Sequence, residues 1–207
     1  MIENIVFDYG GVIVNIHDSI IKKAYMDLNV SWFKQVIHYR KIKTLKDDFI
    51  NGLRPTGDVV DEILKLCGHN VSKEQLYKVL CLLAGELPKQ RICQISKLHG
   101  RYNVFVLSNI NELLWNTCVN QIKQQGFCLE ECFHQVFLSY QMHMAKPHES
   151  IYKALIAEAN IKPEKTLYFD DRKENWQAGL QMGFKASLVK QNHLEDNNDY
   201  IKLLEDL

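Results

Sequence analysis

The feature that most constrains this chain is a short apolar run near its N-terminus that ends in one acidic residue and is followed by glycines. The run is Ile5-Val6-Phe7, the acid is Asp8, and Gly10-Gly11 come two positions later. A buried strand of a parallel sheet carries the residue at its carboxyl tip to the edge where ligands bind in α/β proteins. Glycine lets the backbone approach a ligand closely. The pattern therefore predicts that Asp8 is a nucleophile or a metal ligand.

Five apolar runs rich in β-branched and aromatic residues predict strands. They cover residues 2–7, 102–107, 135–138, 166–169 and 186–189. Helical patterns separate the last four strands and cover residues 89–98, 112–125, 149–159 and 176–182. Strands that alternate with helices predict an α/β fold, here a Rossmann-like parallel sheet covered by helices on both faces.

The segment between residues 14 and 88 breaks this alternation. It contains no clear strand pattern, and its apolar residues recur at helical spacing. Asp58 is a candidate N-cap of one helix, and Ser72 with Gln75 has the pattern of a capping box at the start of another. We expect residues 1–14 and 89–207 to form the α/β core. Residues 15–88 should form an inserted, all-helical cap over the carboxyl edge of the sheet.

Composition argues against several classes of partner. The 25 basic and 25 acidic residues balance, which disfavours nucleic-acid binding by bulk charge, and the basic run from Lys34 to Lys46 has the spacing of a solvated helix face. No apolar run reaches the roughly 18 residues of a membrane span, and no signal peptide is evident. The six cysteines form no CxxC pattern; Cys128 and Cys132 could meet on a helix, but reduced thiols in a cytoplasmic protein are the expectation. The oligomeric state is not predicted.

Polar residues follow four of the predicted strands. Asp8 follows the first, Ser108-Asn109 the second, Lys146 the third and Asp170-Asp171 the fourth. Because the carboxyl ends of parallel strands share one edge, these side chains should converge. A carboxylate can attack phosphorus, and Mg²⁺ held by carboxylate oxygens would offset the repulsion between anions. The set predicts a magnesium-dependent site for phosphoryl transfer, in which Lys146 neutralises the nucleophile and the phosphate.

In this order the segments resemble the four motifs of the haloacid dehalogenase-like hydrolase superfamily. The motifs are residues 5–12, 106–109, 146–147 and 168–175. The resemblance spans almost the whole chain, and the insertion after the first motif corresponds to a helical type-1 cap. The third and fourth motifs are similar to those of the sugar-phosphatase-like branch. The resemblance implies a phosphatase that acts on a small phosphorylated metabolite, such as a sugar phosphate, through an aspartyl-phosphate.

The resemblance also implies the metal ligands. Asp8 is expected to be both nucleophile and ligand, and the backbone carbonyl of Gly10 is expected to be a second ligand. One of Asp170 and Asp171 would bind Mg²⁺ directly and the other through water, and we favour Asp171 for the direct bond.

Phosphate contacts are implied for Ser108, Asn109 and Lys146, the last of which would bridge nucleophile and phosphate. In this family the cap selects the substrate. Arg54 and the turn at Thr56-Gly57 are therefore candidates to face the active site from the cap.

One position departs from the pattern of the family. The usual first motif has a second aspartate that donates a proton to the leaving group and then activates water, and here that position is Gly10. The loss of a positioned acid or base costs roughly 10²–10⁴-fold in rate unless another group substitutes. Candidates for the substitute are Asn15, His17 and Asp18, although we favour the interpretation that these three residues cap the first cap helix.

Three other functions remain open on the sequence. A 2-haloacid dehalogenase also lacks the second acid, but Asp170-Asp171 weighs against it because that branch binds no cation. A binding or regulatory protein on a catalytically weakened scaffold would be consistent with Gly10. A phosphoglucomutase-like transferase depends more heavily on the missing acid.

Overall fold

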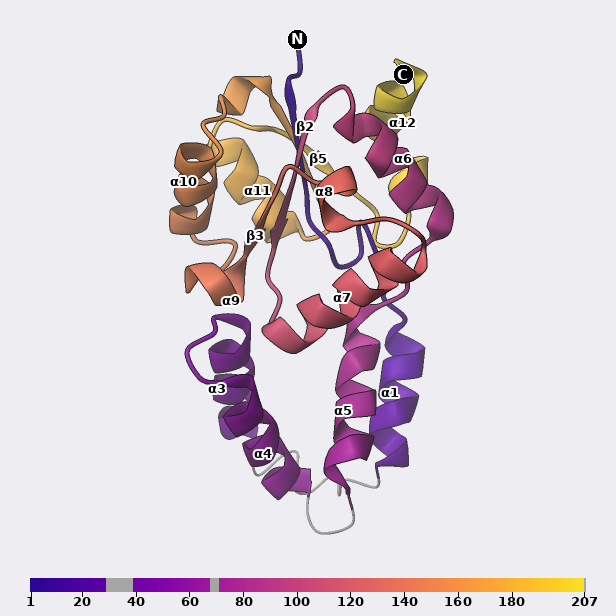
Figure 1. The fold of residues 1–207 in the computed structure, drawn as a ribbon. Coiled ribbons are helices and arrows are strands. Elements are labelled where there is room, and N and C mark those ends of the chain that lie inside the picture. Colours follow the sequence, from indigo (N-terminus) through magenta and orange to yellow (C-terminus); the bar gives the residue numbers. More distant parts are fainter. Residues whose placement is uncertain (29–38, 68–70, 207) are drawn as a thin grey trace.

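The computed structural model describes residues 1–28, 39–67 and 71–206, and its centre is a five-stranded parallel sheet (Figure 1). The strands are β1 (Asn4–Phe7), β2 (Asn103–Ser108), β3 (Gln135–Leu138), β4 (Thr166–Asp170) and β5 (Lys185–Leu188), in the order β3-β2-β1-β4-β5. Every neighbouring pair is parallel. The chain builds outward from β1 to β3, then crosses to the other side of β1. This topology confirms the predicted fold class and puts the point where the order reverses, a preferred ligand site, beside β1.

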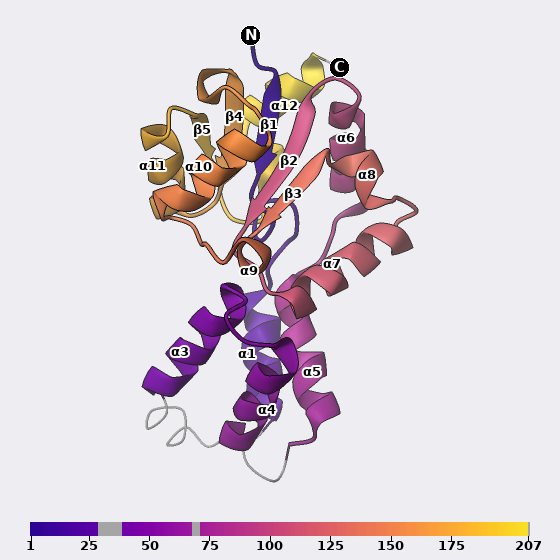
Figure 2. The same cartoon turned by 60° about the vertical axis from the view of Figure 1, so that its left-hand side comes forward.

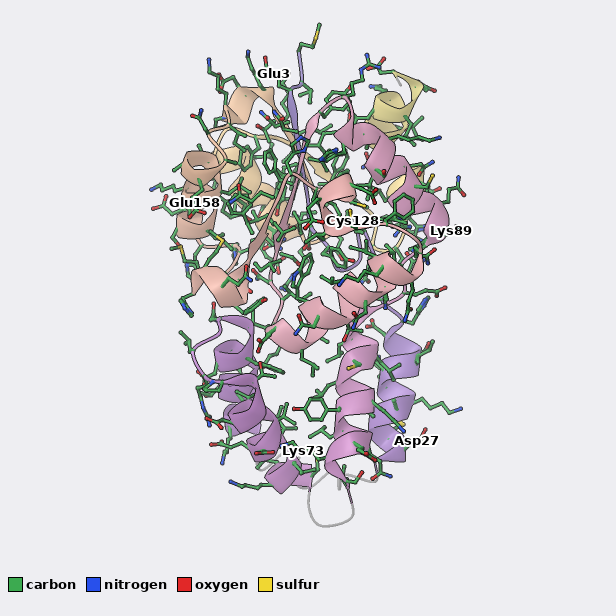
Figure 3. The ribbon with its side chains drawn as sticks, viewed as in Figure 1. Glu3, Asp27, Lys73, Lys89, Cys128 and Glu158 are labelled. Atoms are coloured by element: carbon green, nitrogen blue, oxygen red, sulfur yellow. The ribbon has the colours of Figure 1, made fainter. Side chains whose placement is uncertain are left out.

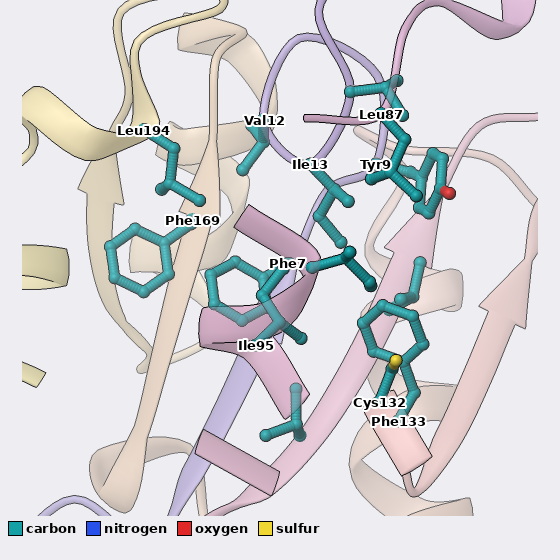
Figure 4. Close-up of a cluster of buried hydrophobic side chains, with 14 of the residues drawn as sticks. Phe7, Tyr9, Val12, Ile13, Leu87, Ile95, Cys132, Phe133, Phe169 and Leu194 are labelled. Atoms are coloured by element: carbon teal, nitrogen blue, oxygen red, sulfur yellow. The ribbon is translucent and has the colours of Figure 1, made fainter. Parts of the chain in front are cut away.

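Helices cover both faces of the sheet, as the pattern predicts. One face packs against α6 (Lys89–His99), α7 (Glu112–Gln124), α8 (Leu129–Cys132) and α12 (Asn198–Glu205). The other face packs against α10 (Glu149–Glu158) and α11 (Lys173–Gln181). Successive residues of a strand point to opposite faces, so Phe7 joins the first apolar cluster and Val6 the second. Figure 4 shows the first cluster, in which the rings of Phe7 and Phe169 stack with centroids 5.1 Å apart.

The helices expected in this part of the chain are all present, and several short elements are additional. The additional ones are α8, α9 (Ser139–Met142), the C-terminal α12 and the 3₁₀ turns at Leu82–Ala84, Pro163–Lys165 and Leu194–Asp196. All of these except α12 have only three or four residues, which is too short to show a periodicity; α12 has eight residues and was not predicted. Gly126 and Gly183, with φ of +90° and +87°, follow the ends of α7 and α11 in the left-handed region that glycine favours.

Four helices lie together beyond the carboxyl edge of the sheet, and we call them the helical unit (Figures 1 and 2). They are α1 (Asp18–Asp27), α3 (Tyr39–Ile50), α4 (Thr56–Cys67) and α5 (Lys73–Cys81). They share an apolar cluster of their own, which includes Val59, Val60 and Leu76. The unit therefore has an independent core, and it meets the sheet domain where α5 packs on α7 and α3 on α9.

The ends of these helices test two capping predictions. The capping box at Ser72 is present, because Gln75 N donates to Ser72 Oγ at 3.1 Å and Ser72 N donates to the Gln75 side chain at 2.8 Å. The N-cap predicted at Asp58 is wrong. Helix α4 already begins at Thr56, and the peptide N–H of Asp58 bonds to the carbonyl of Pro55, so Asp58 lies in the first turn.

The surface is charged and mixed in sign. Side chains such as Glu3, Lys73 and Glu158 project outward from the ribbon (Figure 3). The basic run expected as a solvated face is described only from residue 39 onward; there, Lys41 is exposed while Leu45 is buried, which confirms an amphipathic helix over that part. None of the helices in the described ranges combines the length and apolar character that a membrane crossing requires.

Candidate active site

Three charged side chains meet at the carboxyl edge of the sheet: Asp8 and Asp170 come from strand tips, and Lys146 comes from the loop that follows β3 and α9. Lys146 Nζ lies 3.0 Å from Asp8 Oδ1 and 2.7 Å from Asp170 Oδ2. Ser108 Oγ, at the tip of β2, donates to Asp8 Oδ1 at 3.0 Å. All four residues are buried. The structure thus brings together residues up to 162 positions apart in the chain, as their places at the strand ends predict.

The electrostatics of this cluster follow from burial and from mutual charge. Burial by itself would lower the pKa of Lys146, but the carboxylates of Asp170 and Asp8 outweigh it and raise the pKa. Burial raises the pKa of Asp8, and Asp170 adds to the rise while Lys146 opposes it. Lys146 therefore stays an ammonium. Its single positive charge has to balance two buried carboxylates, which leaves the site short of positive charge.

Asp170 is held by a complete set of donors. Its two oxygens accept hydrogen bonds from Lys146 Nζ at 2.7 Å, Tyr168 OH at 2.5 Å, Asn175 Nδ2 at 3.1 and 3.2 Å, and the peptide N–H of Arg172 at 2.8 Å. These bonds use the lone pairs that a carboxylate offers. The roles of Tyr168 and Asn175 were not predicted. Both residues belong to the fourth motif, residues 168–175, but the motif by itself does not say what their side chains contact.

Asp171 is the more open carboxylate of the pair. It is partly buried, and one of its oxygens lies within 4.8 Å of an oxygen of Asp8 and of Asp170. Burial, with a further contribution from the charges of Asp8 and Asp170, raises the pKa of Asp171 to about 7. Such a triad of hard oxygen donors fits Mg²⁺ or a similar divalent cation.

The glycine pair after Asp8 makes room for this carboxylate. Gly11 has φ of +78°, and a Cβ built there would lie 2.4 Å from Asp171 Oδ2. A side chain at Gly11 would therefore be strained in the backbone and would collide with Asp171. The close approach of the turn to the acidic cluster depends on this glycine.

Asn109 fixes the loop that carries Lys146. Its side-chain amide donates to the carbonyl of Lys146 at 2.8 Å, and its Oδ1 accepts from the peptide N–H of Lys146 at 2.8 Å. The following peptide bond, Lys146-Pro147, is cis. Asn109 thus orients the lysine, and its expected contact with phosphate stays a prediction.

Two of the candidate replacements for the missing acid contact residues outside the Asp8 cluster. Asn15 Oδ1 accepts from Arg91 at 3.0 Å, and His17 Nε2 lies 3.1 Å from a carboxylate oxygen of Glu86. Asp18 is exposed and lies in the first turn of α1. His17 is the N-cap of α1 but makes no capping hydrogen bond with its side chain. Asn15 and His17 therefore serve the connection between the sheet domain and the helical unit.

A cavity of about 340 Å³ lies between the helical unit and the sheet domain. Its lining comes from the α3–α4 loop, from the start of α7 and from α9: Phe49, Gly52, Leu53, Arg54, Pro55, Thr56, Glu112 and Tyr140. Both α7 and α9 begin just beyond the carboxyl ends of strands, so the cavity lies at the same edge of the sheet as Asp8. The lining includes Arg54 and Thr56, which the sequence singled out.

The polar groups of this cavity are held in place. Arg54 Nη2 donates to Glu62 at 2.8 Å, and its other terminal nitrogen lies 4.0 Å from Asp48. Thr56 Oγ1 donates to Glu112 Oε2 at 2.7 Å, which joins the helical unit directly to the sheet domain. The cavity therefore presents fixed donors and acceptors from both sides.

Comparison with known proteins agrees with this geometry. The profile of the haloacid dehalogenase-like hydrolases matches residues 2–183. The chain belongs to this family. The family is one of hydrolases, so the chain is an enzyme.

Three relatives are similar over nearly their whole length. A D-ribitol-5-phosphate phosphatase of Bacteroides thetaiotaomicron is 26% identical over 187 residues, which are 90% of this chain and 91% of that protein. The magnesium complex of an enzyme of this family from the same bacterium superposes with a TM-score of 0.86 at 27% identity, covering 97% of this chain and 98% of the other. A predicted hydrolase of the family from Porphyromonas gingivalis gives 0.85 at 27% identity, covering 100% and 99%.

Proposed function

We propose that this hydrolase is a Mg²⁺-dependent phosphatase that removes the phosphate of a small phosphorylated polyol or sugar through an aspartyl-phosphate. The observation that carries the proposal is the contact of Lys146 with Asp8 and Asp170 beside a third carboxylate. This arrangement puts a nucleophile in contact with an ammonium group, beside a candidate metal site whose carboxylate oxygens lie within 4.8 Å of one another. A structural relative with magnesium and inorganic phosphate bound adds support.

The residues that would hold Mg²⁺ are Asp8, Asp171 and the backbone carbonyl of Gly10. Asp170 is already saturated by donors from the protein, so we assign it to an indirect role in which it orients Lys146. When bound, the cation supplies the positive charge that offsets the repulsion between Asp8 and a phosphate.

Asp8, Ser108 and Lys146 would each have a separate role in the reaction. An oxygen of Asp8 attacks phosphorus, the bond from phosphorus to the ester oxygen breaks, and the leaving group departs as an alcohol once it gains a proton. Ser108 and Lys146 hold the phosphate oxygens. Water next attacks phosphorus, releases inorganic phosphate and regenerates the carboxylate of Asp8. Because Gly10 has no side chain, the proton for the alcohol comes from water or from the substrate itself.

The leaving group would lie in the cavity between the sheet domain and the helical unit. We assign residues 15–88 to a cap on this basis, with the core in residues 1–14 and 89–207. The fixed polar groups of Arg54, Thr56, Glu112 and Tyr140 suit the hydroxyls of a polyol, because such groups donate and accept hydrogen bonds at several points. The relative that acts on D-ribitol 5-phosphate makes five-carbon polyol phosphates the first substrates to test.

The acidic triad favours this activity over dehalogenation, which would not need a cation beside Asp8. A cytoplasmic location and the absence of a nucleic-acid partner, both expected from the sequence, belong to the same proposal.

The test is release of phosphate from a panel of polyol, sugar and aryl phosphates with Mg²⁺ and with EDTA. We expect turnover that requires the metal, and a loss of at least about 10³-fold in Asp8→Asn. Glu112→Gln should weaken kcat/KM for D-ribitol 5-phosphate while leaving p-nitrophenyl phosphate nearly unchanged. Activity that survives EDTA, or full activity in Asp8→Asn, would refute the mechanism. No hydrolysis of any phosphate would favour a binding protein.

A further inference from the structure

Arg91 is the largest fully buried side chain in the described part of the chain, and the proposed reaction does not use it. It lies near the start of α6, and its Nε and Nη2 donate to the two carboxylate oxygens of Glu195 at 2.6 and 2.7 Å. Burial of a guanidinium is costly unless all its donors are paired. A charge retained here, away from the catalytic cluster, calls for a specific explanation.

The remaining donors of Arg91 bind the segment that follows the catalytic turn. Nη1 donates to the carbonyls of Val12 and Ile13 at 2.9 and 3.1 Å, and to Asn15 Oδ1 at 3.0 Å. Because Val12, Ile13 and Asn15 all bind the same nitrogen, the backbone of this segment cannot rotate about one of its bonds without breaking at least one of these hydrogen bonds. Arg91 therefore fixes the chain between Asp8 and the first helix of the helical unit.

Asn192 holds the same segment from the C-terminal side. Its peptide N–H donates to the carbonyl of Gly11 at 2.7 Å, its Oδ1 accepts from the N–H of Ile16 at 2.7 Å, and its Nδ2 donates to the Ile16 carbonyl at 2.8 Å. The amide thus pairs with both backbone groups of one residue, as a neighbouring strand would. We call Arg91, Asn192 and Glu195 the clamp.

The two connections between the sheet domain and the helical unit run side by side at this point. The peptide groups of Asn15 and Glu86 exchange two hydrogen bonds of 2.8 and 2.9 Å. Gly85 has φ of +74°, and a Cβ there would lie 2.6 Å from the Asn15 carbonyl. Ile13, just before the first connection, and Leu87, in the second, both belong to the apolar cluster of the sheet domain (Figure 4). Residues 14–17 and 84–88 therefore form one paired base for the helical unit.

We infer that the clamp is a positioning device that fixes this paired base, and with it the orientation in which the helical unit faces Asp8. The clamp forms hydrogen bonds directly with the first connection, residues 14–17, and is linked to the second, residues 84–88, through the Asn15–Glu86 pairing. Loosening it would let both connections adopt several orientations. The groups with which the helical unit lines the cavity would then no longer be held at a fixed position relative to the phosphate site, while Asp8 and Lys146 would stay in place.

We expect clamp variants to lose more activity on some substrates than on others. This activity measurement rests on the proposed phosphatase function, whereas a measurement of hydrogen exchange does not. A polyol phosphate touches the cavity, whereas p-nitrophenyl phosphate has a good leaving group that gains little from it. In Glu195→Gln and Asn192→Ala we expect the ratio of kcat/KM for D-ribitol 5-phosphate to that for p-nitrophenyl phosphate to fall by about 10-fold or more, because small misplacements are costly. Amide hydrogen exchange at residues 14–17 and 84–88 should rise by a similar factor.

The control is Glu3→Gln, which breaks the exposed ion pair with Lys165 at the opposite edge of the sheet and should change neither readout. If Asn192→Ala does not fold, Asn15→Ala can take its place. This milder variant removes a single acceptor of Arg91 and should also raise amide hydrogen exchange. Unchanged exchange at both connections in all folded clamp variants would overturn the inference, as would an equal loss on both substrates. If the wild-type protein hydrolyses no phosphate, the proposed function fails and hydrogen exchange alone decides the clamp.

Discussion

At the scale of single residues, the unusual feature of this protein is a lysine buried between two carboxylates. Lys146 exposes 1% of its side chain and bonds to Asp8 and Asp170. A buried ion pair gains little net stability, but removal of one partner leaves the others unpaired in a poorly solvated site. The arrangement is therefore better understood as a site prepared for a phosphate and a metal than as a support for the fold.

Removal of this ammonium gives the first prediction. Lys146→Met should lower the free energy of unfolding by about 3–5 kcal/mol in metal-free protein, because two neighbouring carboxylates lose their shared counter-charge. Urea denaturation in EDTA measures it. The matched control is Lys165→Met, which breaks an exposed ion pair with Glu3 and should leave stability unchanged. Equal stability of the two variants would contradict the account.

At the scale of elements, the strand tips determine which residues can meet. The register of the parallel sheet places Phe7 beside Val106 and Phe169, so the residues that follow these strands emerge at one edge. A single residue of slip would turn every side chain of a strand to the other face. The turn after β1 then needs a glycine, because its backbone approaches the carboxylate of Asp171.

The second prediction concerns this turn. Gly11→Ala should cost about 1–3 kcal/mol of stability from the left-handed backbone alone, and should also displace Asp171 and weaken binding of Mg²⁺. Gly57→Ala, in the first turn of α4, is the matched control, since nothing lies within 4 Å of the added carbon and alanine favours helices. Thermal melting with and without Mg²⁺ separates the two effects. A Gly11→Ala protein with wild-type stability and metal affinity would disprove the explanation.

The strands and the convergence of the candidate site residues could be predicted because they carry local signals. Apolar runs mark the strands, and a polar residue at the end of a run marks a strand tip. The clamp could not be predicted, because a lone arginine in an amphipathic helix looks the same whether it is solvated or buried. Arg91 finds its partners 76 to 104 residues away, and only the folded chain brings them together. The same holds for Tyr168 and Asn175, whose contacts with Asp170 need the tertiary structure.

At the scale of the whole molecule, two bodies with separate apolar cores meet at the catalytic edge. The sheet domain supplies the charged cluster, and the helical unit with its α3–α4 loop supplies six of the eight residues that line the cavity. A ligand that binds the acidic triad only in the folded state stabilises that state by an amount that grows with the logarithm of the ligand concentration relative to its dissociation constant. Metal binding should therefore be visible in the stability of the whole chain.

The third prediction uses this linkage. Mg²⁺ at about 100 times its dissociation constant should raise the melting temperature by roughly 5–10 °C, since it adds about 2.7 kcal/mol to a chain of this length. Asp171→Asn should remove most of the shift, because it takes away the most open carboxylate of the triad. Differential scanning calorimetry with MgCl₂ or EDTA measures it. The same shift in wild type and Asp171→Asn would place the metal elsewhere.

The most direct test of the central claim is a crystal structure of the enzyme with Mg²⁺ and trifluoroberyllate, a mimic of a phosphoryl group bound to a carboxylate. The account predicts beryllium bonded to an oxygen of Asp8, fluorine atoms near Ser108 and Lys146, and Mg²⁺ held by Asp8 and Asp171. Trifluoroberyllate that does not bond to Asp8, or a cation bound away from the three carboxylates, would contradict it.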